Sequence, residues 1–214
     1  MRKPRPPHYF FYDWLAPLYD LGVWLVFLPF GGEARLREML LDQTGIREGE
    51  EVLEIFSGTA TLSIMAAKRG AFATALDVTG GMLRVAREKA RGAGIKLNLA
   101  RADASALPFA EGSFDRVVAS MGLHEAAPGV VSEILSEAMR VLRPGGGLTI
   151  MDFHRAEGTA GRLQSLFFTF FEGETARDWV RTDIQSLLSG LGFMDFRRTF
   201  LFERTLQIVT ARKT

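Results

Sequence analysis

The chain has 214 residues, of which 47% are hydrophobic and 24% charged, ordinary proportions for a globular protein of one larger domain. Lysine and arginine number 26 against 25 acidic residues, so the chain has no strong positive field that would favour nucleic acid. The absence of cysteine excludes disulfides and thiolate metal sites, and the three histidines are too scattered to indicate a zinc site.

The amino-terminal part of the chain is first basic and then aromatic. Residues 1–8 carry proline, lysine and arginine, and no apolar signal-peptide core follows them at the usual distance. In the aromatic stretch 9–30, Tyr12 and Tyr19 each precede an aspartate and would share one face of a continuous helix. Pro17 is typical of a break between them. Packing in a core and a lid over a substrate both explain these aromatic residues.

Two further apolar segments precede the first predicted strand. Residues 21–28 are too few to span a bilayer, so we expect a cytoplasmic protein, and contact with a membrane surface stays open. A helix is expected over 33–41, with Leu36, Met39 and Leu40 as its apolar stripe.

The stretch 52–61 is the centre of the predicted organisation, because it reads as a buried strand, a tight turn and a helix start. Its branched apolar residues are typical of a parallel strand covered on both faces. Gly58 in the turn lets a ligand approach the backbone, where the helix start offers free N–H groups. A dinucleotide-binding turn would need further glycines, but Ala60 and Ser63 follow.

Two acids follow the next predicted strands. Asp77 ends the strand 73–77 and lies 19 residues after Gly58, a spacing typical of an acid that binds a ribose. The alternative for Asp77 is a solvated aspartate that caps the next helix. Asp103 follows the predicted strand 96–100 in the same way, and an ordinary loop aspartate is its alternative.

The fourth predicted strand, 114–120, leads into a loop that contains His124. A histidine has the pKa range for proton transfer near neutral pH, although a hydrogen bond within the loop would explain it equally well. A helix with an apolar stripe over 131–142 should end at Arg143-Pro144-Gly145-Gly146 and turn the chain into the strand 148–151.

The segment 155–181 is expected to be an insertion whose helix is apolar almost all round and therefore needs cover on several sides. It would pack on the aromatic residues 9–30 and cover an apolar pocket, or it would form a second packing layer. A helix from Thr182-Asp183, a strand to Phe200 and a last strand over 206–211 complete the chain.

Taken together, these motifs resemble the class I methyltransferases that use S-adenosylmethionine, in the branch that acts on quinones and phospholipids. The likeness extends over residues 12–211. It is carried by V-L-E at 52–54 with Gly58 and Thr59, D-x-x-x-x-M-L at 77–83, A-D-A at 102–104, L-P-F at 107–109 and R-V-L-R-P-G-G at 140–146. The family usually has glycine where this chain has Phe56 and Ala60.

The predicted strands, most of them preceded by a helical stretch, imply a doubly wound α/β sheet. The resemblance implies that this sheet is Rossmann-like, with seven mostly parallel strands and an antiparallel last strand. We expect one methyltransferase domain over 1–214. Residues 1–44 would be a helical lid, 45–214 the Rossmann-like core, and 155–181 an insertion after the fifth strand that belongs to the lid. The cofactor implied is S-adenosyl-L-methionine, and no metal is implied.

The resemblance also assigns site residues. Asp77 would bind the ribose, Asp103 and Ala104 the adenine, and His124 would be the base for an acceptor that must lose a proton. Glu54 would orient the amino-acid end of the cofactor or the turn, and Tyr19 would join His124 on the catalytic side. The complete cofactor-binding set is Tyr12, Glu54, Gly58, Thr59, Asp77, Val78, Met82, Asp103, Ala104 and Ser120.

The aromatic content suggests a small, apolar acceptor that resembles a lipid or a quinone. Two alternatives remain. A non-catalytic relative that binds an adenosyl ligand or a partner protein is motivated by Phe56 and Ala60, because a bulky side chain could crowd the cofactor. A nicotinamide-dependent oxidoreductase would require the glycines that the turn after Gly58 lacks.

Overall fold

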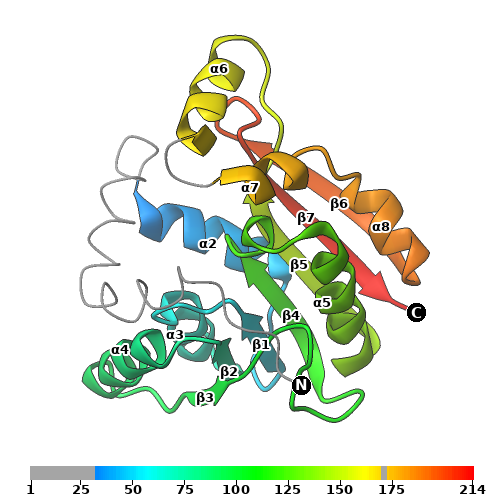
Figure 1. The fold of residues 1–214 in the computed structure, drawn as a ribbon. Coiled ribbons are helices and arrows are strands. Elements are labelled where there is room, and N and C mark those ends of the chain that lie inside the picture. Colours follow the sequence, from blue (N-terminus) through cyan, green and yellow to red (C-terminus); the bar gives the residue numbers. More distant parts are fainter. Residues whose placement is uncertain (1–31, 170–172) are drawn as a thin grey trace.

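A computed structural model of the chain describes residues 32–169 and 173–214 (Figure 1). The predicted lid residues Tyr12 and Tyr19 therefore lie outside the described residues. The helices are α2 (Glu33–Thr44), α3 (Thr61–Lys68), α4 (Gly80–Gly92), the 3-10 helix η2 (Leu123–Glu125), α5 (Pro128–Val141), α6 (Gly158–Phe167), α7 (Gly173–Trp179) and α8 (Ile184–Gly190). The strands are β1 (Glu51–Ile55), β2 (Phe72–Asp77), β3 (Asn98–Arg101), β4 (Phe114–Ser120), β5 (Leu142–Phe153), β6 (Phe193–Leu201) and β7 (Leu206–Lys213).

The strands form one seven-stranded sheet in the order β3-β2-β1-β4-β5-β7-β6. The pairs β1–β2, β2–β3, β1–β4 and β4–β5 are parallel, whereas β7 is antiparallel to both of its neighbours. The predicted fold class is thus confirmed. The strand order runs outward from β1 to β3 and then resumes at β4 on the other side of β1. The switch point, where open α/β sheets bind their ligands, therefore lies between the carboxyl ends of β1 and β4.

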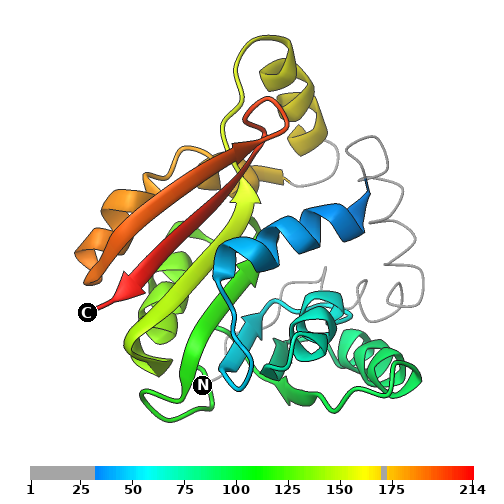
Figure 2. The ribbon, with the colours of Figure 1, turned by 180° about the vertical axis from the view of Figure 1, so that it is seen from behind.

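Helices cover both faces of the sheet because its central strands are apolar on both sides. In β1, Leu53 and Ile55 join a core cluster with α5, α7 and α8, which Figure 1 shows in front of the sheet. Val52, one position earlier, belongs to a second cluster that holds Leu36 and Leu40 of α2 together with residues of α3. Figure 2 shows α2 crossing that opposite face. The alternation follows from the two-residue period of a strand.

The predicted Arg-Pro-Gly-Gly turn lies inside the start of β5. Helix α5 ends at Val141, and the register with β4 shifts between Phe114 and Arg116 as the chain passes this turn. A Cβ added at Gly146 would lie 2.8 Å from the carbonyl oxygen of Arg143, so the backbone here is too close for a side chain. Strand β5 is longer than expected and includes Asp152, which the sequence places just after the strand.

The insertion 155–181 contains two helices, α6 and α7. The described residues do not cover α6 on several sides, because none of its residues is buried and Leu163 and Leu166 are 64% and 56% exposed. Residues 9–30, on which this segment was expected to pack, lie outside the described part of the chain. Phe168, just after the helix, is 2% exposed and stacks edge-on against Phe153 at 5.0 Å between ring centroids. Figure 1 shows α6 projecting beyond the end of the sheet. Within the two described ranges, no helix is long and apolar enough to cross a membrane.

Candidate active site

Most of the predicted site residues that the structure describes lie at one edge of the sheet, because β1 to β4 are parallel and their carboxyl ends meet there. Glu54 is the second-last residue of β1, and Asp77 and Ser120 are the last residues of β2 and β4. Asp103 follows β3 by two residues, and Gly58 and Thr59 form the turn after β1.

Asp77 ties the turn after β1 to the end of β2. Its Oδ2 accepts a hydrogen bond of 2.8 Å from the backbone N–H of Gly58. Its Oδ1 accepts from the backbone N–H of Thr79 at 2.9 Å and from the Thr79 hydroxyl at 2.7 Å. A carboxylate has about four acceptor positions, so the half-buried Asp77 can accept one more donor beside these three bonds.

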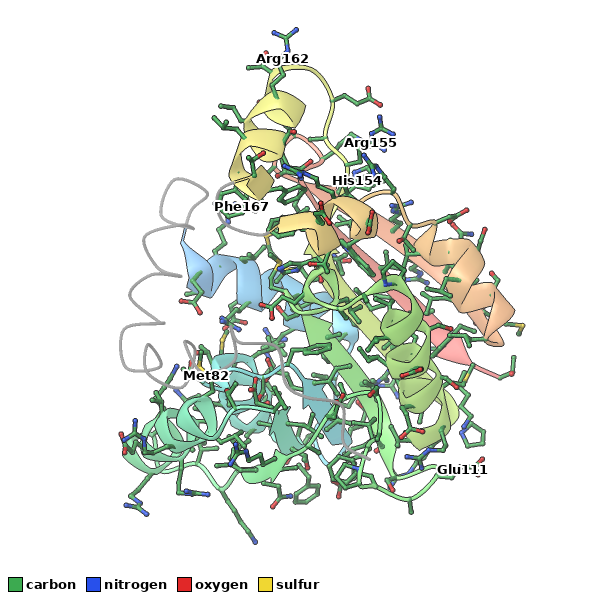
Figure 3. All side chains as sticks on the ribbon, viewed as in Figure 1. Met82, Glu111, His154, Arg155, Arg162 and Phe167 are labelled. Atoms are coloured by element: carbon green, nitrogen blue, oxygen red, sulfur yellow. The ribbon has the colours of Figure 1, made fainter. Side chains whose placement is uncertain are left out.

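The residues expected around an adenine are partly buried and partly open. Ala104 and Met82 are buried at 5% and 3% exposure, and Figure 3 shows Met82 at the start of α4. Asp103 is exposed, and its Oδ1 accepts from both the N–H and the hydroxyl of Ser105, at 2.9 and 2.8 Å. The carbonyl of Val78 accepts from Arg101 at 3.2 Å. Both of these bonds use Oδ1 of Asp103, and a carboxylate has further acceptor positions that a ligand could use.

His124 makes a buried pair with Asp152 of β5. The Nδ1 of His124 lies 2.7 Å from Oδ1 of Asp152, and the two residues are 3% and 0% exposed. The Asp152 carboxylate also accepts backbone N–H groups of Leu123 at 3.0 Å, His124 at 3.3 Å and Phe153 at 2.7 Å. Because the carboxylate only accepts, the network assigns a proton to Nδ1 of His124, and Nε2 becomes the basic nitrogen of the neutral ring.

Backbone strain also gathers at the switch point. Phe56 and Ala60 after β1, and Met121 after β4, have φ values of 58°, 58° and 54°. Non-glycine residues rarely adopt this left-handed region, and such strain persists where the surrounding structure enforces it, often at functional sites. The turn after β1 therefore has the glycine-like backbone that the motif implies, even though two of its glycines are replaced.

Comparison with known proteins matches residues 52–146 to a methyltransferase domain. An uncharacterized methyltransferase of Synechocystis sp. is 34% identical over 207 residues, which are 94% of this chain and 92% of the relative. The chain belongs to the S-adenosylmethionine-dependent methyltransferases. The demethylmenaquinone methyltransferase of Thermus thermophilus is 34% identical over 157 residues, 72% of this chain and 70% of the relative. The structure of a SAM-dependent methyltransferase from Methanosarcina mazei, 26% identical, has a TM-score of 0.65 and covers 81% of this methyltransferase and 96% of the neighbour.

The turn after β1 of this methyltransferase fits a polar ligand such as the amino-acid end of S-adenosylmethionine. Among the residues that the structure describes, Ser57 Oγ is the buried side-chain polar atom without a hydrogen-bond partner. An unpaired buried hydroxyl costs about 1–3 kcal/mol, which a bound polar ligand would recover. The neighbouring Gly58 is also in the left-handed region, at a φ of 52°, where its backbone has no side chain to keep a ligand away.

Two residues of the site are missing from the sequence prediction. Lys89 of α4 donates to the hydroxyls of Thr59 and Thr61 at 2.9 and 2.6 Å, which puts a positive charge beside the start of α3. No local signal marks Lys89, because the two threonines are 30 and 28 residues away. The sequence does give an indication for Asp152, because this acid directly follows an apolar strand and a buried acid needs a partner.

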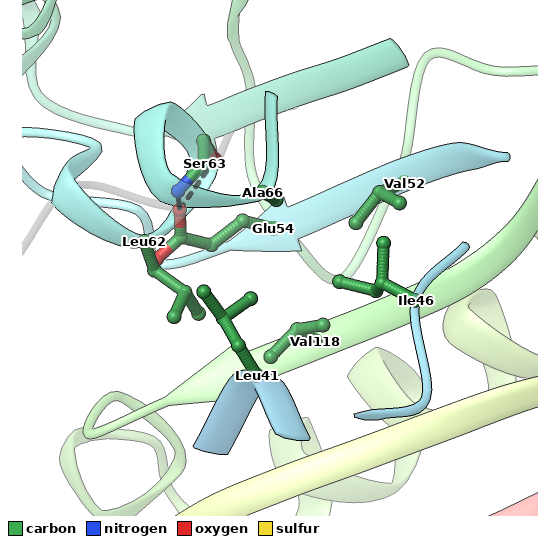
Figure 4. Close-up of a pocket in the computed structure, with 8 residues that line it drawn as sticks. All are labelled: Leu41, Ile46, Val52, Glu54, Leu62, Ser63, Ala66 and Val118. Carbon is green, nitrogen blue, oxygen red and sulfur yellow. Dashed lines mark hydrogen bonds between the residues drawn. The ribbon is translucent and has the colours of Figure 1, made fainter. Parts of the chain in front are cut away.

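Glu54 is enclosed by side chains of α2, α3 and β4, which leave no room for a water-sized molecule (Figure 4). Its carboxylate accepts the backbone N–H of Ser63 at 2.9 Å and also the Ser63 hydroxyl. Glu54 thus holds the first turn of α3, which lacks a side-chain cap of its own. Burial raises the pKa of Glu54 to about 7, against the opposing effects of the Ser63 hydrogen bonds and the Arg37 charge.

This raised pKa predicts a pH dependence of stability. Between pH 4.5 and about 7 the folded protein keeps a proton on Glu54 that the unfolded chain has lost, so the free energy of unfolding falls as the pH rises through this window. The fall attributable to Glu54 is about 3 kcal/mol at pH 8 relative to pH 4.5. Glu54→Gln should remove it, as measured by urea unfolding at several pH values.

Carboxylates with a lowered pKa change the free energy of unfolding in a different pH range from Glu54. The hydrogen bond from Arg140 lowers the pKa of Glu137, so its contribution is lost only as the pH falls below 4.5. The difference between wild type and Glu54→Gln therefore isolates the Glu54 effect. An equal slope in both proteins between pH 5 and 8 would show that Glu54 is charged in the folded state throughout.

Proposed function

We propose that this methyltransferase transfers a methyl group from S-adenosylmethionine to a small, apolar, quinone-like acceptor. The observation that carries the proposal is the buried His124–Asp152 pair next to the ring of Phe153, beyond the carboxyl end of β4. The rings of His124 and Phe153 are 4.7 Å apart, and Phe153 also meets Phe167 and Phe168 at 6.1 and 5.0 Å. A demethylmenaquinone methyltransferase among the relatives supports the same acceptor class.

The cofactor would be held by the residues at the ends of β1 to β4. We assign a ribose hydroxyl to Asp77, the adenine to Asp103, Ala104 and Met82, and the amino-acid end to the turn at Gly58. The bound cofactor supplies a methyl group on a positively charged sulfur, which is a good leaving group. The protein's own contribution is to hold the acceptor atom in line with that methyl group at about 3–3.5 Å.

His124 would remove the proton that the acceptor loses. A hydroquinone carbon or oxygen gives up a proton when it is methylated, and Nε2 of His124 is the ring nitrogen that would take it, because Nδ1 contacts Asp152. Asp152 would then stabilise the positively charged imidazole, because it is buried beside Nδ1. Tyr19, the other catalytic candidate, lies outside the described residues and stays a prediction.

We further propose that α6 brings this site to the surface of a membrane, where an apolar acceptor would be dissolved. Gln164 holds one side of α6 to backbone groups at 154–156. At 100° per residue, Arg162 and Leu166 lie on the side of the helix opposite Gln164, and Leu163 lies on the flank next to Leu166; all three are exposed. Figure 3 shows Arg162 at the tip of the molecule. Exposed leucines beside an arginine suit the interface of an anionic bilayer.

The test supplies purified protein with S-adenosylmethionine and a demethylmenaquinol of short side chain, and detects the methylated product by mass spectrometry. Saturating cofactor at about 100 times its Kd should add about 2.7 kcal/mol of stability, or roughly 5–10 °C in Tm. Cofactor binding without product from the quinol would overturn the acceptor class. The membrane proposal predicts sedimentation with phosphatidylglycerol vesicles, and a protein that stays in the supernatant would contradict it.

A further inference from the structure

Phe56 and Gly122 form a matched pair across the switch point of the sheet. Phe56 directly follows β1, and Gly122 lies in the loop between β4 and η2. A Cβ added at Gly122 would lie 2.3 Å from Cγ of Phe56 and 2.7 Å from its Cδ2, so the phenyl ring lies directly against the glycine. Because no larger residue fits beside this ring, position 122 requires glycine as long as Phe56 is present.

This contact links the two halves of the proposed site. The turn that begins with Phe56 contains Ser57, with its unpaired hydroxyl, and Gly58, which is held by Asp77. The loop that contains Gly122 continues two residues later into His124. The phenyl ring therefore stands between the turn proposed to hold the donor and the loop that carries the proposed base.

The backbone conformation of Phe56 is unfavourable for a residue with a side chain. Phe56 has a φ of 58°, a conformation that costs a residue with a side chain about 1–2 kcal/mol and that glycine adopts freely. The ring packs against the core cluster yet stays partly exposed. Its burial therefore offsets the cost of the backbone conformation only in part. Strain of this kind, at the place where the fold binds its ligands, indicates a role in binding.

We propose that the Phe56 ring recognises the positively charged sulfonium of the methyl donor and so favours S-adenosylmethionine over its neutral product, S-adenosylhomocysteine. An aromatic ring within about 6 Å of a cation attracts it, whereas the neutral thioether gains only apolar contact. Such a preference would help the spent cofactor to leave after each reaction. This inference rests on the proposed cofactor site at the turn after β1.

The experiment measures the Kd of each ligand by calorimetry and compares their ratio in wild type and Phe56→Leu. Leucine keeps an apolar side chain but has no π face. Binding of S-adenosylmethionine should weaken by roughly 2- to 30-fold, while the Kd of S-adenosylhomocysteine should change by less than about two-fold, since its apolar contact remains. Phe72→Leu is the matched control, because Phe72 is 59% exposed at the start of β2, the opposite end of that strand from Asp77.

Each outcome decides one question. An unchanged ratio in Phe56→Leu would overturn the role in sulfonium recognition, even if both ligands bind wild type. A second variant, Phe56→Gly, relieves the backbone strain, and tighter binding of both ligands to it would show that the ring obstructs the site and would likewise overturn the proposal. If neither ligand binds to folded wild type, the proposed cofactor site itself is wrong.

Discussion

Asp77→Asn is expected to weaken the binding of S-adenosylmethionine by about 10- to 100-fold. A carboxylate that accepts a ribose hydroxyl makes a charge-assisted hydrogen bond, worth about 1.5–3 kcal/mol against 0.5–1.5 for a neutral one. Asparagine has nearly the same shape, and its carbonyl oxygen can still accept the N–H of Gly58 or of Thr79. The variant therefore removes the negative charge while it keeps a hydrogen bond that holds the turn. Calorimetric titration with S-adenosylmethionine and S-adenosylhomocysteine measures the effect.

Two comparisons make this result decisive. Asp178→Asn removes a carboxylate from the exposed side of α7 and should leave both Kd values unchanged. Asp77→Ala removes every acceptor, including those for Gly58 and Thr79, so it should abolish binding and also lower the Tm. If Asp77→Asn binds the cofactor as tightly as wild type, Asp77 only braces the turn and the ribose assignment fails.

The second large effect is expected from Asp152. In Asp152→Ala, the N–H groups of Leu123, His124 and Phe153 and the ring of His124 lose their buried acceptor. Breaking a buried pair by removing one partner costs about 3–5 kcal/mol. For a chain of this size each kcal/mol corresponds to about 2–4 °C, so Tm should fall by roughly 6–20 °C in a thermal melt.

Asp152→Asn separates catalysis from stability. Its oxygen can still accept backbone N–H groups, but an amide NH₂ next to Nδ1 favours the tautomer that has the proton on Nε2, where a base needs a lone pair. Methyl transfer should then fall by about 10²- to 10⁴-fold, with little change in the Kd of the cofactor. His124→Gln is the companion variant. Full kcat with an unchanged pH profile in both variants would make the pair structural.

The predictions of strands, turns and helix starts were confirmed where residues close together in the chain decide the conformation. The apolar run 52–55 followed by Ser57 and Gly58 forms β1 and its turn, and α8 starts at Asp183, whose carboxylate accepts the N–H of Ser186 at 3.2 Å. In each case, neighbours within a few residues supply the physical reason for the conformation. The antiparallel last strand, which the family resemblance implies, is also present, as β7 between β5 and β6.

Two expectations depended on contacts that are distant in the chain. Strand β5 continues past the predicted end at 151 because Asp152 pairs with Gln207 and Phe153 with Leu206 of β7. Helix α6 has an apolar pattern typical of a covered helix, yet Leu163 and Leu166 are exposed. Periodicity says which residues share a face, but it does not say whether another part of the molecule packs against that face.

Local sequence was sufficient for the fold class, for the acids that end β2 and follow β3, and for the methyltransferase motifs, since these depend on residues close together in the chain. Tertiary structure alone decided the chemistry of the site. His124 meets Asp152 across 28 residues, Gly122 must be glycine because of Phe56, and the pKa of Glu54 is raised because α2 and α3 exclude water from it. Burial and contact are properties of packed elements, and no stretch of sequence contains them by itself.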